Sequence, residues 1–299
     1  MTRVGVVGAG RVGAVLAAAL AGPQASGRYQ IAAVAGESAA TRTRIETLLP
    51  GVRVDKPTAV ARSCDLLLLA VPDDMLENVV TMLSAAGAIR PGQYVAHTSG
   101  RHGLAVLEAA AERGAHVLAL HPAMTFTGTD VDLARLPGCA FGVTAGDDSR
   151  TIAERLVADL GGRPVWVPEE RRTLYHAGLA HGANHLVTLV AQAMDLLRAS
   201  GATDPAATLR PLLSAALDNA LSYGDAALTG PIVRGDVNTV RAHLADIAES
   251  SPATLESYVV MARATANRAV LDGRLLPVRA AKIVGVLNDA LAEHRQVHA

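Results

Sequence analysis

Residues 4–13 read VGVVGAGRVG, and this stretch decides the fold. An apolar run leads directly into the glycines, and a second apolar run over 12–21 has the small side chains of a closely packed helix. In such a strand, turn and helix, Gly8 permits the tight turn, Gly10 lets backbone N–H groups approach a diphosphate, and Gly13 allows close helix–strand packing. The positive end of the helix dipole faces the phosphates. The stretch therefore predicts a dinucleotide site that includes Gly8, Gly10, Arg11, Val12 and Gly13.

The turn after the next apolar run, residues 31–35, bears on which nicotinamide nucleotide is bound. An acid at this turn favours the ribose diol of NAD, whereas Ser or Arg favours the 2′-phosphate of NADP. Glu37 argues for NAD or is simply a solvated loop acid, while Ser38 with Arg42 or Arg44 could hold a phosphate. We predict NADP, with Ser38 in its site, and leave NAD open.

Short apolar runs alternate with helical stretches as far as residue 168, which is typical of a parallel sheet with covering helices. The run over 66–71 is apolar without interruption, as expected for a central strand buried on both faces. Predicted strands span 3–7, 31–35, 66–71, 93–97, 116–120, 140–143 and 164–167, with a short extended piece at 52–54.

After Pro168 the strand pattern stops and helix start and stop signals take over. We therefore expect a dinucleotide-binding domain over 1–168 and an all-helical substrate and dimerisation domain over 169–299. Its helices are predicted from about 171 to 200, from Asp204-Pro205 to Tyr223-Gly224, from Asp236, from Ser251-Pro252 to Asp272-Gly273, and from Pro277.

The composition excludes several classes of protein. Hydrophobic residues make up 50% but aromatic residues only 3%, so the core must be built from Ala, Val and Leu, as in α/β or all-α folds. A net charge of −1 gives no general attraction to nucleic acid or anionic membranes. Cys64 and Cys139 are isolated and fit free thiols. With no signal-peptide pattern and no long apolar stretch, we expect a cytoplasmic protein.

Polar residues follow three predicted strands, at the sheet edge where parallel sheets bind ligands. His121 and His97 are candidate proton donors, because histidine titrates near neutrality, although either ring could be structural. Ser99 could hydrogen-bond a substrate oxygen or cap the helix that starts near Gly103. The three segments are Val71-Pro72-Asp73-Asp74, His97-Thr98-Ser99-Gly100 and His121-Pro122-Ala123-Met124-Thr125-Phe126.

The predicted long helix carries a second polar cluster. His176 and Asn184 lie two turns apart and within about 80° around the helix axis, so they could face one cleft. His181 and His185 have the i,i+4 spacing of a zinc pair, but no Glu stands in the HExxH position and no third ligand is evident. We predict no metal site.

A turn that contains Gly230 and Pro231 precedes Arg234, whose guanidinium could grip a carboxylate bidentately. Alternatively, Arg234 forms a surface ion pair while Asp236 caps the next helix. With Thr229, this segment is a candidate substrate contact.

Together these motifs resemble a family of Rossmann-like proteins with a C-terminal domain of unknown function (family 2520), related to ketopantoate reductase and pyrroline-5-carboxylate reductase. The resemblance covers nearly the whole chain and implies a Rossmann parallel sheet, a helical second domain like that of 6-phosphogluconate dehydrogenase, and a homodimer. Its carriers are Gly8-Ala9-Gly10-Arg11-Val12-Gly13, Val71-Pro72-Asp73, His97-Thr98-Ser99-Gly100, His121-Pro122 with Thr125-Phe126, Tyr175-His176-Ala177 with Asn184, and Thr229-Gly230-Pro231 with Arg234-Gly235-Asp236.

The resemblance implies an NAD(P)H-dependent oxidoreductase that reduces a small 2-oxo acid, with ketopantoate as the best single guess. The alternatives are an imine reductase of the pyrroline-5-carboxylate type and a non-catalytic NAD(P)-binding regulatory protein. Ketopantoate reductases usually carry a lysine four residues before the asparagine, where this chain has Ala180. His121 resembles the His-Pro histidine of prephenate dehydrogenases. The implied catalytic residues are His121, Ser99, Asn184 and His176; Val71 and Pro72 adjoin the cofactor, and His97, Thr229 and Arg234 contact the substrate.

Overall fold

The computed structural model describes residues 1–298, which form two compact units that divide after Gly182. The first unit contains every strand, and the second is entirely helical among its described residues. The division lies inside helix α8 (Arg172–Ala199). The sequence placed a boundary earlier, where the strand pattern stops, and the last strand does end shortly before that point.

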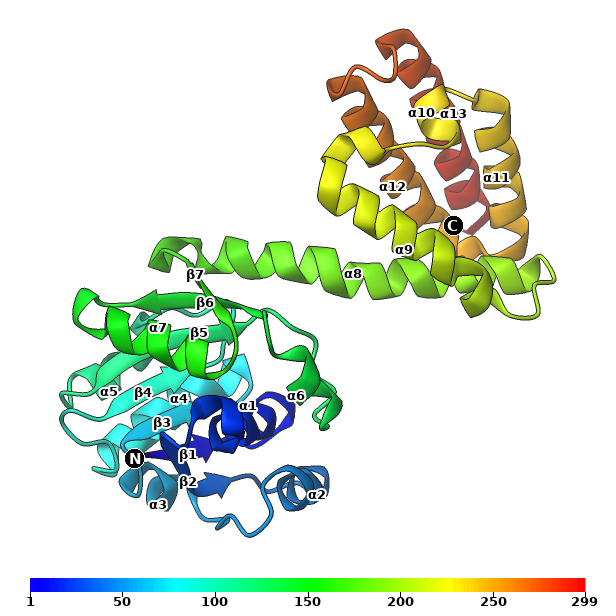
Figure 1. The fold of residues 1–299 in the computed structure, drawn as a ribbon. Coiled ribbons are helices and arrows are strands. Elements are labelled where there is room, and N and C mark those ends of the chain that lie inside the picture. The colour runs from blue at the N-terminus through cyan, green and yellow to red at the C-terminus, as the bar shows by residue number, and fades with distance from the viewer. Residues whose placement is uncertain (299) are drawn as a thin grey trace. The chain divides into compact units, whose positions relative to one another are not determined.

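The first unit is built on one seven-stranded sheet with the order β2-β1-β3-β4-β5-β6-β7 (Figure 1). All seven predicted strands are present, and Val54 in the predicted extended piece forms an isolated bridge with Val34. The strands are β1 (Thr2–Val7), β2 (Tyr29–Ala35), β3 (Leu66–Leu69), β4 (Tyr94–His97), β5 (His116–Pro122), β6 (Ala140–Ala145) and β7 (Arg163–Trp166).

The predicted Rossmann sheet is confirmed, and its strands are parallel except at one place, where β6 runs antiparallel to β5. A parallel neighbour needs a crossover connection, usually a full helix across one face of the sheet. The connection between β5 and β6 contains only the five-residue helix α6 (Val131–Arg135). The chain therefore turns back beside β5, and the sheet is predominantly but not entirely parallel.

Helices cover both faces of the sheet, and the alternating residues of β3 show how (Figure 1). Leu66 and Leu68 join a core with α1 and α7, while Leu67 and Leu69 join a second core with α3, α4 and α5. All four leucines are buried, as the uninterrupted apolar run predicts. The helices are α1 (Arg11–Ala21), α2 (Ala39–Leu48), α3 (Pro57–Arg62), α4 (Asp73–Ala85), α5 (Glu108–Ala111) and α7 (Arg150–Asp159).

The second unit packs its helices around an aliphatic core that includes Leu244, Leu255 and Ile283. The predicted helix ends are largely confirmed: Gly201 has φ +94° after α8, and the Asp204 carboxylate accepts the Ala207 N–H at 2.9 Å. The short helix α10 was not predicted. The helices after α8 are α9 (Pro205–Tyr223), α10 (Pro231–Arg234), α11 (Val237–Ser250), α12 (Pro252–Leu271) and α13 (Pro277–His298).

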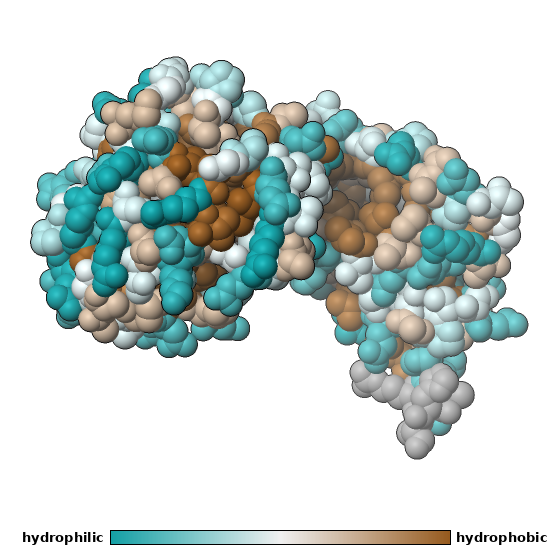
Figure 2. Space-filling view, turned by 90° about the horizontal axis from the view of Figure 1, so that it is seen from below, coloured by the Kyte–Doolittle hydropathy of each residue, from teal (hydrophilic) through white to brown (hydrophobic). Residues whose placement is uncertain are grey.

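The helical unit leaves apolar side chains uncovered. Residues 183–189 of α8 are all exposed, which includes Val187 at 71%. On α9, Leu212, Leu217 and Leu221 are exposed, the last at 79%. Apolar surface is visible on this unit and on the first unit in Figure 2.

Candidate active site and nucleotide loop

The glycine loop between β1 and α1 has the geometry that its sequence predicts. Gly8 has φ +91°, and a Cβ there would lie 2.6 Å from the Ala70 carbonyl oxygen. A Cβ on Gly13 would overlap the Gly8 carbonyl oxygen, so only glycine allows α1 to pack this closely. By contrast, a Cβ on Gly10 would meet only one atom, the Gly8 oxygen at 4.0 Å. The loop therefore presents open space at the N-terminus of α1, as a bound diphosphate requires.

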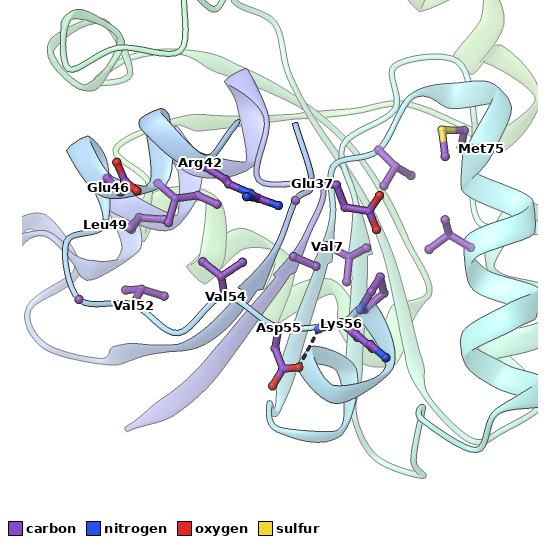
Figure 3. Close-up of a pocket in the computed structure, with 18 residues that line it drawn as sticks. Val7, Glu37, Arg42, Glu46, Leu49, Val52, Val54, Asp55, Lys56 and Met75 are labelled. Atoms are coloured by element: carbon purple, nitrogen blue, oxygen red, sulfur yellow. Dashed lines mark hydrogen bonds between the residues drawn. The ribbon is translucent and has the colours of Figure 1, made fainter. Parts of the chain in front are cut away.

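A cavity of about 830 Å³ lies beside this loop, at the carboxyl ends of β1, β2 and β3. Figure 3 shows Glu37, Arg42 and Lys56 around it, contributed by three separate segments of the chain. Val7 and Val71 supply apolar surface next to Gly8. The cavity combines an apolar floor with charged groups, which suits a nucleoside with a phosphate.

Of the candidate phosphate ligands after β2, two are already engaged within the protein. Ser38 caps α2, because its Oγ accepts the Thr41 N–H at 3.2 Å. Arg44 Nε donates to the Gly128 carbonyl at 3.1 Å. The side chains of Arg42 and Lys56 make no hydrogen bond or ion pair within residues 1–298. Arg42 and Lys56 are therefore the cations available to a ligand, and Lys56 was not recognised in the sequence.

His97, a predicted substrate contact, is completely buried at the end of β4. The Ser99 N–H donates to His97 Nδ1 at 3.1 Å, so Nε2 carries the proton and donates to the Gly103 carbonyl at 2.8 Å. Burial lowers the pKa of His97 to about 4, which keeps the ring neutral. This geometry favours a role in holding the loop over contact with a substrate.

Ser99 holds the same loop from its other side. Its Oγ accepts the His102 N–H at 3.2 Å within the loop, whereas the next helical turn begins only at Ala105, with Leu104 as its N-cap residue and no side-chain cap. Its carbonyl accepts a hydrogen bond from Arg172 Nη2 at 2.7 Å. The Glu169 carboxylate accepts the Leu104 N–H at 2.7 Å. The segment after β4 is therefore fixed by residues at and just before the start of α8.

His121, at the end of β5, lies at the centre of a polar cluster. Its Nδ1 is 3.1 Å from Tyr175 Oη, and its ring meets the ring of His176 edge-on with centroids 5.7 Å apart. A Cβ on Gly100 would lie 3.0 Å from His121 Nε2 and would overlap His176, so the glycine makes room for both rings. Burial, and then the nearby His176 and Arg172, lower the pKa of His121 to about 4.

Arg172 is a fully buried cation beside this cluster. Besides Ser99, it donates to the Gly142 carbonyl at 3.3 Å and to Thr144 Oγ1 at 3.1 Å. Its Nε has no hydrogen-bond partner in the described structure, and no carboxylate there forms an ion pair with it. Its guanidinium carbon lies 5.9 Å from the centroid of the Tyr175 ring. Burial lowers the pKa of Arg172.

Neither Arg172 nor Tyr175 was assigned a role from the sequence. Their signal is the spacing of Arg172, Tyr175 and His176, which at i, i+3 and i+4 share one face of a helix. That spacing could have grouped the three residues, but not identified what they face.

The glycine loop and the His121 cluster occupy the same edge of the sheet. Gly8 lies against Ala70 and Val71, and Pro72 precedes α4 as its N-cap residue. Asp73, at the start of α4, acts electrostatically on His121 and pairs with Arg101 Nε at 3.4 Å. The first unit thus places the glycine loop and the His121 cluster on loops at the same edge of the sheet.

Three predicted site residues belong to the second unit. Asn184 is exposed on α8, and Thr229 is exposed before α10. Arg234 Nε pairs with the Asp236 carboxylate at 2.9 Å, in agreement with the predicted surface ion pair. The Asp236 side chain forms no hydrogen bond that caps α11, so the predicted cap is not present.

Among the described side chains, no three His, Cys, Asp or Glu residues are grouped so that they could hold a metal ion. Within residues 1–298, no helix is both long and apolar enough to cross a membrane.

Two protein-family models match the chain. Residues 1–122 match the model of a Rossmann-like domain, and residues 139–265 match the model of a domain of unknown function (DUF2520). The chain joins a Rossmann-like domain to DUF2520. The predicted combination of domains is confirmed. A comparison with curated proteins found no match.

Solved structures share the fold of this Rossmann-like and DUF2520 chain over most of its length. A provisionally assigned NADP oxidoreductase from Bacteroides fragilis has 20% identity and a TM-score of 0.75, covering 89% of this chain and 98% of its own. A pyrroline carboxylate reductase from Plasmodium falciparum with NADP bound has 12% identity and a TM-score of 0.56, with coverages of 95% and 98%. An imine reductase from Streptomyces aurantiacus has 17% identity and a TM-score of 0.63, with coverages of 90% and 98%. At these identities the similarity establishes the fold.

Proposed function

We propose that this protein is an NADPH-dependent reductase of a small carbonyl or imine compound. The observation that carries the proposal is the His121 and Tyr175 pair on the same sheet edge as the glycine loop. A reductase needs a hydride donor and a proton donor beside one another, and this edge offers a place for each. Two solved structures with the same fold support this choice, since one is named as an NADP oxidoreductase and the other as an imine reductase.

The space around the glycine loop fits a bound nucleotide. Side chains would not fit at Gly8 or Gly13, while Gly10 leaves room for a diphosphate at the first N–H groups of α1. Arg42 and Lys56 would hold the 2′-phosphate, and Val71 with Pro72 would adjoin the nicotinamide end. When bound, NADPH supplies hydride to the acceptor carbon of the substrate.

The chain supplies the proton and the alignment. Because His121 is neutral near pH 7, its Nε2–H can act as a hydrogen-bond donor to the oxygen or nitrogen that gains negative charge. His97 and Ser99 keep the loop after β4 in place beside this ring. His176 limits the space around His121.

The substrate class rests on the sequence and the relatives. A small 2-oxo acid, with ketopantoate as the first to test, remains the proposal for a carbonyl substrate. A cyclic imino acid is the second candidate, favoured by the fold shared with pyrroline carboxylate and imine reductases. Asn184, Thr229 and Arg234 remain the proposed contacts for the substrate and its carboxylate.

The test follows NADPH absorbance at 340 nm with ketopantoate, other 2-oxo acids and pyrroline-5-carboxylate, using wild type and His121→Asn. We expect turnover of at least one class and a loss of about 100-fold in kcat for His121→Asn, within the range typical of general acid catalysis. NADPH binding without turnover of any compound would reject the reductase and favour the regulatory alternative. An unchanged rate in His121→Asn would remove that histidine from its role.

We also propose that the helical unit forms a homodimer and that the protein works in the cytoplasm. The exposed Leu217, Leu221 and Val187 support the first proposal, since apolar area of this kind is costly in water. The free, buried thiols of Cys64 and Cys139 fit the second.

A further inference from the structure

Arg172 is a fully buried cation that has no role in the reductase proposal. A buried charge is costly unless it is paired, and a buried arginine normally meets a carboxylate. Arg172 instead meets two carbonyl oxygens and one hydroxyl, and its Nε is unpartnered among the described residues. Glu169 and Asp73 act on its charge without forming an ion pair, so no carboxylate of residues 1–298 contacts the guanidinium directly, and it can stabilise a negative charge that forms only transiently.

Tyr175 is the group beside Arg172 that can become negative. Its ring lies near the guanidinium, and its hydroxyl lies 3.1 Å from His121 Nδ1. A Cβ on Gly142 would lie 2.5 Å from Tyr175 Oη, so the glycine in β6 makes the space that the hydroxyl occupies. Burial raises the pKa of Tyr175, and the charge of Arg172 opposes that rise. The phenol is therefore protonated at rest, with a cation in place to stabilise its anion.

We propose that Tyr175 supplies a proton through His121 to the substrate, and that Arg172 stabilises the phenolate formed in this step. The proposal deepens the proposed function and rests on it. Tyr175 does not touch the substrate in this scheme. It is a positioning residue that fixes the His121 tautomer and transfers a proton to Nδ1 as Nε2 releases its own proton.

The relay moves two protons in each catalytic cycle. At rest the Tyr175 hydroxyl donates to His121 Nδ1, so the proton of the neutral ring is on Nε2. As hydride reaches the substrate carbon, the Nε2–H bond breaks and a new O–H or N–H bond forms on the substrate. The Tyr175 O–H bond breaks and its proton binds Nδ1, which leaves a neutral His121 and a phenolate. The phenolate then recovers the Nδ1 proton, and one proton from solvent restores Nε2.

The alternative proton source in the cluster is His176, and the geometry favours Tyr175. His176 meets His121 only edge-on, without a hydrogen bond, whereas the Tyr175 hydroxyl lies 3.1 Å from His121 Nδ1. The charged or titratable groups that act on His121 are His176, Arg172 and Asp73. Those that act on Tyr175 are Arg172 and Cys139. None of these except Asp73 is a carboxylate.

The first experiment needs neither cofactor nor substrate. Nitrogen-15 NMR of histidine rings at pH 7 identifies the His121 tautomer, with the signal assigned by its loss in His121→Asn. We expect Nε2–H in wild type, and a mixture of tautomers in Tyr175→Phe, because that variant keeps the ring packing but loses the donor. An Nδ1–H tautomer in wild type would overturn the proposal, since His121 would then donate to Tyr175.

The second experiment measures turnover on the substrate found above. We expect Tyr175→Phe to lower kcat about 100-fold with little change in KM, and to change the proton inventory in mixed H₂O and D₂O from two transferred protons to one. Equal rates or the same inventory in both proteins would overturn the proposal.

Tyr258→Phe is the matched control. Tyr258 also lies beside a histidine, with its hydroxyl 2.9 Å from His243 Nδ1, but it belongs to the helical unit. We expect this variant to keep wild-type kcat and the two-proton inventory, so that a loss seen only in Tyr175→Phe supports the relay. If no substrate is turned over, the reductase proposal fails, while the NMR result still decides whether Tyr175 sets the His121 tautomer.

Discussion

At the scale of single residues, the cations near the adenosine end of the nucleotide should set cofactor preference. Arg42 lines the cavity and has no partner in the described structure, so its guanidinium is free to bind a phosphate. A hydrogen bond to a charged group contributes about 1.5 to 3 kcal/mol. We expect Arg42→Ala to weaken NADPH binding by at least about tenfold and to leave NADH binding almost unchanged. Calorimetric titration measures both.

Arg53→Ala is the control for this change, because Arg53 is exposed, pairs with Asp55 at 3.5 Å and does not line the cavity. It should leave both affinities as they are. If Arg42→Ala weakened NADH and NADPH equally, Arg42 would not be reading the 2′-phosphate.

His97 and His121 should make the fold sensitive to acid. Both have a pKa lowered to about 4, from an ordinary value near 6.5, first of all by burial. Between these values the unfolded chain binds more protons than the folded one, so stability is complete above about pH 6.5 and falls as the pH is lowered toward 4. The loss is about 3 kcal/mol for each ring at 1.36 kcal/mol per pKa unit.

Urea unfolding at pH 7.5, 6, 5 and 4.5 checks this expectation. His97→Gln should flatten the dependence by one proton, because the lowered pKa of that ring is removed. A wild-type protein equally stable at pH 7.5 and 4.5 would show that these rings are not held neutral.

At the scale of elements, two glycines of the same loop should affect different properties. Gly13 should affect the stability of the fold, and Gly10 should affect NADPH binding. In Gly13→Ala the new methyl group meets the Gly8 carbonyl oxygen, so α1 must shift, at a cost of about 1 to 3 kcal/mol typical of overpacking. In Gly10→Ala nothing in the fold obstructs the methyl group, which instead occupies the room meant for the diphosphate. We expect Gly10→Ala to keep the stability of wild type but to lose NADPH binding by more than tenfold.

Thermal unfolding and NADPH fluorescence titration of the two variants distinguish these effects. Wild-type affinity in Gly10→Ala would mean that the nucleotide does not approach this glycine.

Elements were predictable from the sequence where their signals are local. The strand, turn and helix at Gly8 to Gly13 and the uninterrupted leucines of β3 each depend on neighbouring residues. The direction of β6 was not predictable in the same way, because it depends on the path of the connection after Pro122, which contains only the five-residue helix α6, and not on the strand itself. Similarly, the role of Arg172 depends on packing against Ser99 and Thr144, which are distant in sequence.

At the scale of the whole molecule, the uncovered helices predict association. Val187→Glu with Leu221→Glu places charges among exposed apolar side chains of α8 and α9. We expect light scattering at micromolar concentration to give twice 30.8 kDa for wild type and 30.8 kDa for the double variant. Leu271→Glu, at an exposed side chain at the end of α12, should remain dimeric. A monomeric wild type would reject the dimer.

The most direct test of the central claim is transfer of the hydride itself. NADPH that carries deuterium at the transferred C4 position is incubated with wild type and a 2-oxo acid or cyclic imine, and the product is analysed by mass spectrometry and NMR. We expect one deuterium on the former carbonyl or imine carbon, and strongly reduced product with Gly10→Ala. If NADPH binds and no product of the panel carries deuterium, the protein is not a reductase of these compounds.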